Sequence, residues 1–321
     1  MDSKTLENKW GEIGEEVLTN FKSVRIASDC ISNLYIGNNN DLKRCLILTI
    51  PKNVTLDVID DVKEYLALEF FDTSGHLVIT LLENNFKELF NDFIISIYNK
   101  IKDISNPKTA SEQLIIIYQN WCEFFHESSI NKLSGEEIQG LFGEMFYLQK
   151  LLTAASSATV NDVLKSWTGP YDRGQDFMFA NKTIEVKTKV LSQIDVSISS
   201  EFQLQPELGK SLELKVISVE LYTEKGKSIG QLLLDIKSII NSKQGDISVI
   251  LKALAKKGLT LENIQEYDNL KFDVRSEITY NCITEGFPRL SVSNIPEQLR
   301  KLKYTLRLVG LDTFIIESIQ F

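Results

Sequence analysis

Three residues near the middle of the chain, Asp176, Glu185 and Lys187, are of the types that carry out metal-assisted hydrolysis of phosphodiesters. Carboxylate oxygens are preferred ligands of Mg²⁺, which retains several waters for substrate and nucleophile. The ion would polarise a phosphoryl oxygen and lower the pKa of a bound water. A lysine beside it can orient that water or stabilise the charge that develops in the transition state. Because buried charges are costly unless they are paired or bound to metal, the three residues form a candidate site.

The sequence around these residues predicts a β-hairpin. Residues 176–180 and 183–190 are rich in aromatic and β-branched side chains, and Asn181-Lys182 between them supplies a two-residue turn. With that turn, Asp176 faces Lys187 across the hairpin. Because side chains alternate along a strand, the two carboxylates and the lysine are expected to share one face of the sheet.

This spacing resembles the signature of the PD-(D/E)XK nuclease superfamily: Asp176, eight residues, Glu185, one residue, Lys187. Gln175 stands where the signature has proline. The resemblance implies that Asp176 and Glu185 ligate Mg²⁺ or Mn²⁺ and that the Val186 carbonyl could add a third oxygen. It also implies that Lys187 positions or activates the attacking water. A solvated strand face is the alternative interpretation, since short motifs also occur by chance.

A predicted helix before the hairpin carries a fourth candidate, Glu144. Ser134-Gly135-Glu136-Glu137 has the pattern of a capping box, and an apolar stripe follows between residues 138 and 152. Glu144 lies on the edge of that stripe, and the poor helix formers Gly140 and Gly143 suggest that another backbone passes close by. In PD-(D/E)XK nucleases a glutamate on this helix often contributes to the metal site, and Glu144 matches that position. An exposed helix glutamate is the alternative.

The order of the predicted elements extends the resemblance. A strand at 195–204, a strand at 212–222 and a helix at 228–240 follow the hairpin. Helix, hairpin, strand, strand, helix is the order expected of the superfamily core. The predicted fold class is therefore α/β (α+β), with a restriction-endonuclease-like mixed sheet flanked by helices.

Further stretches look more particularly like a bacterial family, the PD-(D/E)XK motif proteins of restriction-like defence operons. Besides the hairpin, these stretches are residues 167–170, which read Trp-Thr-Gly-Pro, and residues 199–204. Ser199, Glu201 and Gln203 could face the site or DNA, or they could form an exposed polar face. The resemblance implies DNA as the substrate and other subunits of a restriction-like system as partners, and it leaves homo-oligomer formation open.

Two domains are predicted. Residues 1–82 form a small β-rich accessory domain, since four short strands separated by turn-like runs occur there. Residues 83–321 form the nuclease-like domain, with a helical N-terminal part and a C-terminal extension. The family resemblance is assigned to residues 84–321, with its specific marks within about 134–204. The predicted strands are 34–37, 44–50, 66–71 and 76–82, and the predicted helices are 84–102 and 110–127.

Composition is that of a globular protein with a sizeable core: of 321 residues, 43% are apolar and 25% are charged. The net charge of −9 is unfavourable for DNA binding, so either the basic surface is local or partner subunits provide the contact with DNA. No stretch approaches the roughly 18 apolar residues that span a bilayer. Residues 1–7 lack the apolar core of a signal peptide. We therefore expect a cytoplasmic protein with no membrane partner.

Other chemistries find little support in the sequence. The four cysteines are scattered without a C-x-x-C pair, so neither a zinc site nor a disulfide framework is predicted. The two histidines, His76 and His126, lie in no recognisable motif, and no Gly-rich phosphate loop is present. The favoured hypothesis is a Mg²⁺-dependent DNA endonuclease in a restriction or defence system. The alternative is a non-catalytic scaffold or DNA-binding subunit that keeps the nuclease fold, and an enzyme acting on RNA also stays open.

Overall fold

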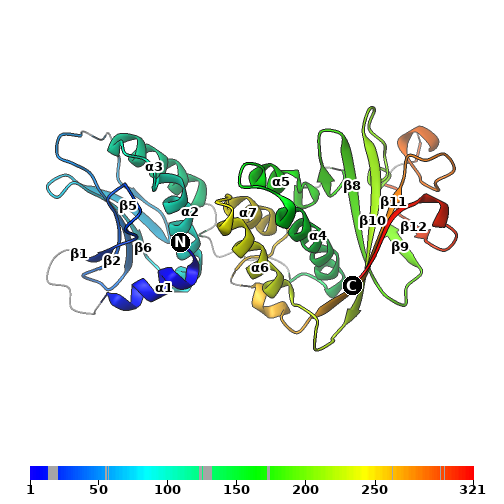
Figure 1. Ribbon diagram of the computed structural model, residues 1–321, viewed down its shortest axis with the longest axis horizontal. Helices are drawn as coiled ribbons and strands as arrows, with labels where there is room; N and C mark the ends of the chain where they lie inside the picture. Colours follow the sequence, from blue (N-terminus) through cyan, green and yellow to red (C-terminus); the bar gives the residue numbers. More distant parts are fainter. Residues whose placement is uncertain are drawn as a thin grey trace. The chain divides into compact units, whose positions relative to one another are not determined.

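The computed structural model describes residues 1–13, 21–54, 56, 58–122, 125, 132–171, 174–261, 263–296, 298–299 and 301–321. The chain forms two compact units. Unit 1 comprises Met1–Ser129 and Asp246–Leu251, and unit 2 comprises Ile130–Gly245 and Lys252–Phe321 (Figure 1). No helix within the described ranges is both long and apolar enough to cross a membrane.

Unit 1 is built on a six-stranded antiparallel sheet with the order β1-β2-β3-β6-β5-β4. Its strands are β1 (Phe21–Arg25), β2 (Leu34–Asn39), β3 (Arg44–Thr49), β4 (Asp61–Val62), β5 (Leu66–Phe71) and β6 (His76–Leu81). The helices beside it are α1 (Ser3–Glu12), α2 (Lys87–Ile101) and α3 (Pro107–Cys122) (Figure 1). The four predicted strands and the two predicted helices are confirmed, whereas β1 and β4 were not predicted. The last residues of the helix predicted at 110–127 lie outside the described residues, apart from residue 125.

Helices α2 and α3 complete the core of unit 1. Phe86, just before α2, contacts Tyr65 with ring centroids 4.6 Å apart. The Tyr118 hydroxyl of α3 donates a hydrogen bond to the Asp61 carbonyl in β4 (3.0 Å). A sheet with an apolar face must bury that face against another layer, and these helices provide it. The chain therefore divides after Ser129, not at the predicted boundary after residue 82.

Unit 2 is built on a five-stranded mixed sheet with the order β13-β11-β10-β8-β7, in which β8 and β10 are parallel. Its strands are β7 (Phe177–Met178), β8 (Lys182–Val190), β10 (Ser211–Leu221), β11 (Phe272–Asn281) and β13 (Ile315–Gln320). On one side lie α4 (Gly135–Ala154), α5 (Val160–Ser166) and α6 (Ile229–Ser242), and on the other the two-stranded sheet of β9 (Asp195–Ile198) and β12 (Tyr304–Arg307) (Figure 1). Helix α7 (Ser248–Lys256) includes the point at which the chain passes from unit 1 to unit 2. The predicted α/β (α+β) fold, a mixed sheet flanked by helices, is confirmed.

The strand predicted at 195–204, which the sequence pattern would make the third strand of the main sheet, is wrong in its length and in its place. Strand β9 ends at Ile198 and pairs with β12, outside the main sheet. The chain turns next, where the Ser199 N–H donates to the side-chain oxygen of Gln203 (2.7 Å). Such side-chain to backbone bonds compete with strand pairing, and the sequence pattern does not reveal them. Ile198 and Leu204 are nevertheless both fully buried, in an apolar core shared with the main sheet.

Helices α4 and α6 both begin with capping boxes. The Ser134 hydroxyl accepts the Glu137 N–H, and the Glu137 carboxylate accepts the Ser134 N–H. Ser228 and Gln231 make the same reciprocal pair at the start of α6. Two backbone N–H groups are satisfied in each case, which fixes the first turn of the helix. The start of α4 is thereby defined, and with it the position of Glu144 along the helix.

A buried ion cluster fastens α4 to the sheet. Lys215 of β10 is 3% exposed, and its ammonium lies 2.6 Å from Glu277 of β11, which is fully buried. The Lys150 ammonium of α4 lies 2.5 Å from the second Glu277 oxygen. Lys215 also contacts the Thr279 hydroxyl (2.7 Å) and the Glu317 carboxylate (3.4 Å). Each buried charge therefore has a partner, as burial of charge requires.

Replacing Glu277 with leucine is expected to destabilise the protein by about 3–5 kcal/mol, because the Lys215 ammonium would stay buried without its main partner. The double variant Glu277→Leu with Lys215→Met is expected to recover most of that loss, since both charges are then removed. Urea denaturation followed by circular dichroism measures the free energy of unfolding of both variants. Equal losses in the single and double variants would contradict the assigned pairing.

Candidate functional site

The hairpin that carries the candidate residues has a different register from the predicted one. Met178 of β7 lies opposite Thr183 of β8, where the predicted turn would place Ala180. The turn predicted at Asn181-Lys182 is therefore wrong by one residue: the Phe179 N–H donates to the Lys182 carbonyl (2.8 Å), and Ala180-Asn181 lies between them. The register differs by two residues, and because the side-chain period of a strand is two, a shift of two keeps every side chain on its predicted face.

Asp176, Glu185 and Lys187 consequently lie together. Asp176 Oδ2 accepts a hydrogen bond from the Val186 N–H (2.8 Å). Lys187 Nζ lies 2.8 Å from Glu185 Oε1. The Glu185 side chain is fully buried and Asp176 is nearly so, with 9% of its surface exposed. The three charged side chains therefore lie together in a region with low solvent exposure.

Glu144 of α4 reaches the same place. Glu144 Oε2 and Asp176 Oδ1 each lie 2.6 Å from the point that a Cβ on Gly169 would occupy. Both oxygens therefore border one small space that the missing side chain leaves open. Trp167 Nε1 donates a hydrogen bond to Glu144 Oε2 (2.8 Å) and orients the carboxyl group. Glu144 is not an exposed helix glutamate, and it converges with the hairpin residues.

The approach of α4 to β8 depends on Gly143. A Cβ at that position would lie 1.8 Å from the Thr188 hydroxyl oxygen, so no larger residue fits without movement. Gln139 Nε2, one turn earlier on α4, donates to the Thr188 carbonyl (3.0 Å). Around Gly140 nothing lies within 4 Å of such a Cβ. The close approach inferred from the two glycines therefore occurs at Gly143 and not at Gly140.

The polar residues predicted to face the site or DNA have different positions. Gln203 Oε1 accepts a hydrogen bond from Lys187 Nζ (3.0 Å) and so belongs to the site. Glu201 is buried elsewhere and accepts the backbone N–H groups of residues 301 and 302 (3.3 and 3.0 Å). Ser199 borders the same hollow as Gln203.

Three residues of the site were not predicted from the sequence: Trp167, Gly169 and Lys257. Trp167 and Gly169 fall in the Trp-Thr-Gly-Pro stretch that carried the family resemblance, and that stretch was the available signal. Lys257 follows α7 and lines the hollow, and its positive charge partly opposes the rise that burial causes in the pKa of both Glu144 and Asp176. No local pattern marks Lys257, because only the tertiary fold brings it to the site.

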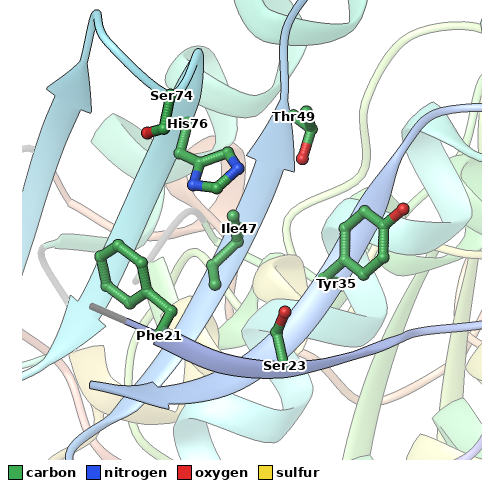
Figure 2. Close-up of a pocket in the computed structure, with 7 residues that line it drawn as sticks. All are labelled: Phe21, Ser23, Tyr35, Ile47, Thr49, Ser74 and His76. Carbon is green, nitrogen blue, oxygen red and sulfur yellow. The ribbon is translucent and has the colours of Figure 1, made fainter. Parts of the chain in front are cut away.

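Two hollows in the structure differ in the kinds of residues that line them. The converging side chains line a hollow of about 670 Å³ in unit 2, together with Val186, Lys189, Gln203 and Lys257. A second hollow, of about 610 Å³, lies on the sheet of unit 1, where Figure 2 shows Phe21, Tyr35 and His76 around Ile47. Among the residues that line it there is no carboxylate, lysine or arginine, and burial lowers the pKa of His76. Charge-dependent chemistry therefore belongs to the hollow in unit 2.

A family comparison agrees with this geometry. Residues 6–309 match a family model described as "Putative PD-(D/E)XK family member, (DUF4420)". The chain belongs to this family. The match begins at residue 6, whereas the predicted resemblance began at residue 84, so this family model covers unit 1 as well as unit 2. No curated protein and no solved structure matches the chain.

Burial dominates the electrostatics of this PD-(D/E)XK site. Burial, reinforced by the nearby Asp176 carboxylate, raises the pKa of Glu185 to about 8. Burial and then Asp176 also raise the pKa of Glu144 well above its ordinary value. Burial raises the pKa of Asp176 although the Lys187 ammonium opposes the shift. For Lys187 burial lowers the pKa, but the carboxylates of Glu185 and Asp176 outweigh burial, and the pKa is raised.

The residues present fit a divalent cation by their chemistry. Three carboxyl groups face the ammonium groups of Lys187 and Lys257, so negative charge is in excess once all of the carboxyl groups ionise. In the described part of the chain neither Glu185 oxygen accepts a hydrogen bond of good geometry, although Lys187 lies at ion-pair distance. Buried hard oxygen donors of this kind suit Mg²⁺ or Mn²⁺. The described residues contain no group of three or more His, Cys, Asp or Glu already arranged to hold a metal ion.

The metal-free protein is expected to lose stability as the pH rises from about 4.5 to about 8. Unfolded Glu185 ionises near its ordinary pKa of 4.5, whereas the folded residue keeps its proton to about pH 8. The folded state thus binds more protons in this window, and stability then falls as pH rises. Thermal unfolding in EDTA across the window measures the effect. The fall should be smaller in Glu185→Gln, and an equal fall in both proteins would contradict the assignment.

Proposed function

We propose that the chain is a Mg²⁺-dependent DNA endonuclease, with Mn²⁺ as an alternative ion, that works in a restriction or defence system. The observation that supports this proposal is the convergence of Glu144, Asp176, Glu185 and Lys187 in one hollow of unit 2. The four side chains come from α4, the residue before β7, and β8, in the order that PD-(D/E)XK family membership implies. The proposed reaction is hydrolysis of a phosphodiester bond.

Asp176 and Glu185 would hold the ion. Because Asp176 Oδ2 is engaged by the Val186 N–H, Oδ1 is directed to the space that it shares with Glu144 Oε2. Glu185 offers two oxygens that accept no hydrogen bond of good geometry from the described residues. The Val186 carbonyl would add a third oxygen, and Glu144 would assist through a second metal ion or a water. When bound, the ion supplies polarisation of the phosphoryl oxygen and a more acidic water.

Lys187 would orient the attacking water and stabilise the charge that develops on the phosphoryl group. Its ammonium contacts Glu185 Oε1 and Gln203 Oε1 at 2.8 and 3.0 Å. An ammonium has three N–H donors, so a third can meet a water or a phosphate oxygen. The raised pKa of Lys187 keeps the group charged through the neutral range.

DNA is the proposed substrate, and partner subunits are proposed to provide much of the contact with it. Lys187, Lys189 and Lys257 supply positive charge within the hollow. The chain as a whole carries a net charge of −9, which disfavours extended binding to phosphates. We therefore propose that other subunits of a restriction-like system, or further copies of this chain, complete the DNA-binding surface. A cytoplasmic location of the complex is part of the same proposal.

Asp176→Ala and Lys187→Ala are each expected to lower Mg²⁺-dependent cleavage of plasmid DNA by about 10²–10³-fold, because each removes a group that acts on the reacting phosphate. Lys182→Ala is the matched control, since Lys182 lies on the same strand and pairs with Glu213 (3.7 Å) away from the hollow. Circular dichroism checks that all three variants stay folded. Full activity in both Asp176→Ala and Lys187→Ala would refute the proposed site.

A non-catalytic scaffold that keeps the nuclease fold is the second candidate function. It is favoured by one observation, that the described residues contain no ready-made set of three metal ligands. Calorimetric titration with Mn²⁺ separates the two candidates. A nuclease is expected to bind the ion as wild type and to lose binding in Asp176→Ala, with release of protons because the carboxyl groups must ionise. A scaffold should bind the ion in neither protein.

A further inference from the structure

Gln175 occupies the position that the superfamily signature gives to proline, and it is buried, with 4% of its surface exposed. Its Nε2 group donates to the carbonyls of Phe202 (2.8 Å) and Gln205 (3.2 Å) and lies 3.4 Å from that of Gln203. A proline has no polar side chain and could make none of these bonds. The departure from the signature therefore joins the hairpin to the turn formed by residues 199–205.

Gln203 projects from that turn to Lys187. Its Oε1 accepts hydrogen bonds from the Ser199 N–H (2.7 Å) and from Lys187 Nζ (3.0 Å). Because a backbone N–H and an ammonium can only donate, the oxygen of the Gln203 amide must face them. The other acceptor beside Lys187 Nζ is Glu185 Oε1, at 2.8 Å. The ammonium is thus held between two oxygens that belong to different segments.

The turn itself is anchored at several points. Leu204 is fully buried in the core below the main sheet. Gln205 Oε1 accepts the Val292 N–H (2.8 Å), which ties the end of the turn to another segment of unit 2. Gln175 adds the connection to the hairpin. Backbone position in the turn therefore decides where the Gln203 side chain lies relative to Lys187.

We infer that Gln175 and Gln203 are positioning residues for Lys187. Gln175 holds the turn of residues 199–205, and Gln203 on that turn fixes the Lys187 ammonium beside Glu185. The inference rests on the proposed nuclease function, because it takes the orientation of water by Lys187 as the step that benefits. The lysine side chain is a flexible four-carbon stem. A hydrogen-bond acceptor in a fixed position restricts that side chain in advance, so less conformational entropy is lost when the ammonium takes up the reactive geometry.

The first link, by which Gln175 holds the turn of residues 199–205, is tested in the metal-free protein by a measurement that does not depend on DNA cleavage. Gln175→Met keeps the side chain's size and removes its donors, so amide hydrogen exchange within residues 199–205 is expected to become about tenfold faster. Gln193→Met is the matched control. The Gln193 side chain accepts the Val190 N–H (2.9 Å) and does not bond to the turn, so exchange there should not change. Unchanged exchange in Gln175→Met would overturn the first link.

The second link, by which Gln203 fixes the Lys187 ammonium, is tested by the kinetics of DNA cleavage. Gln203→Leu is expected to lower kcat about 10–100-fold with KM changed by less than about threefold, as misplacement of one catalytic group does. Gln203→Glu keeps an oxygen at the Oε1 position and should retain kcat within about threefold of wild type. Lys182→Ala, which loses only the ion pair with Glu213 away from the hollow, is the control, and its kcat should stay within about twofold of wild type. Equal loss of kcat in all three variants would indicate a structural role only and would overturn the inference.

A third measurement follows Lys187 directly and does not need cleavage. Acylation of Lys187 in the metal-free protein, read by mass spectrometry of peptides, should become at least about threefold faster in Gln203→Leu, because the amine loses an acceptor that holds it. In Lys182→Ala the rate should not change. If Gln175 acts on Lys187 through Gln203, the double variant Gln175→Met with Gln203→Leu should lose no more kcat than Gln203→Leu alone. A loss of kcat equal to the product of the two single losses would contradict this.

These measurements separate the two proposals. If wild type cleaves DNA and Gln203→Leu keeps its kcat, the positioning inference fails and the nuclease proposal stands. If wild type fails to cleave DNA, the nuclease proposal fails, and the exchange and acylation rates still decide whether Gln175 and Gln203 hold Lys187.

Discussion

The burial of three carboxyl groups around one small space is the constraint on which the rest of unit 2 depends. Like charges taken out of water repel one another and lose hydration, so neighbours must hold them in place. Trp167 orients Glu144, the Val186 N–H binds Asp176, and Lys187 adjoins Glu185. None of these groups removes the excess of negative charge. Burial raises the pKa values of all three carboxyl groups, and the Asp176 carboxylate adds to the rise for Glu144 and Glu185.

Holding the carboxyl groups together requires that a helix and a hairpin, distant in sequence, keep one relative position. A capping box fixes the start of α4, and the absence of a side chain at Gly143 lets the helix lie against β8. The ion pair between Lys150 and Glu277 fastens the same helix to β11. The capping box, the glycine contact and the ion pair are each common features of proteins. Their combination brings Glu144 to Asp176, which local sequence preference alone does not do.

The sequence predicts the fold and the candidate site to the extent that they depend on periodicity. Faces of strands follow from a period of two, so Asp176, Glu185 and Lys187 meet even though the predicted turn is wrong. Features that depend on particular tertiary contacts cannot be predicted from the periodicity of the sequence. The end of β9 depends on a bond between Ser199 and Gln203, and the extent of unit 1 depends on which helices cover its sheet. The identities of neighbours such as Trp167 and Lys257 depend on the same long-range packing.

Helix α4 carries two charge clusters of opposite character. One, around Lys150, joins two lysines to two glutamates and is neutral as a set. The other, around Glu144, sets three carboxyl groups beside the ammonium groups of Lys187 and Lys257. The two lie six residues apart on the helix, about 9 Å along its axis. In the first, the central Glu277 carboxylate contacts both lysines, whereas in the second the carboxyl groups outnumber the ammonium groups. Changes at the two ends of this stretch should therefore act differently: near Lys150 on how the helix is fixed to the sheet, and near Glu144 on the charge of the candidate site.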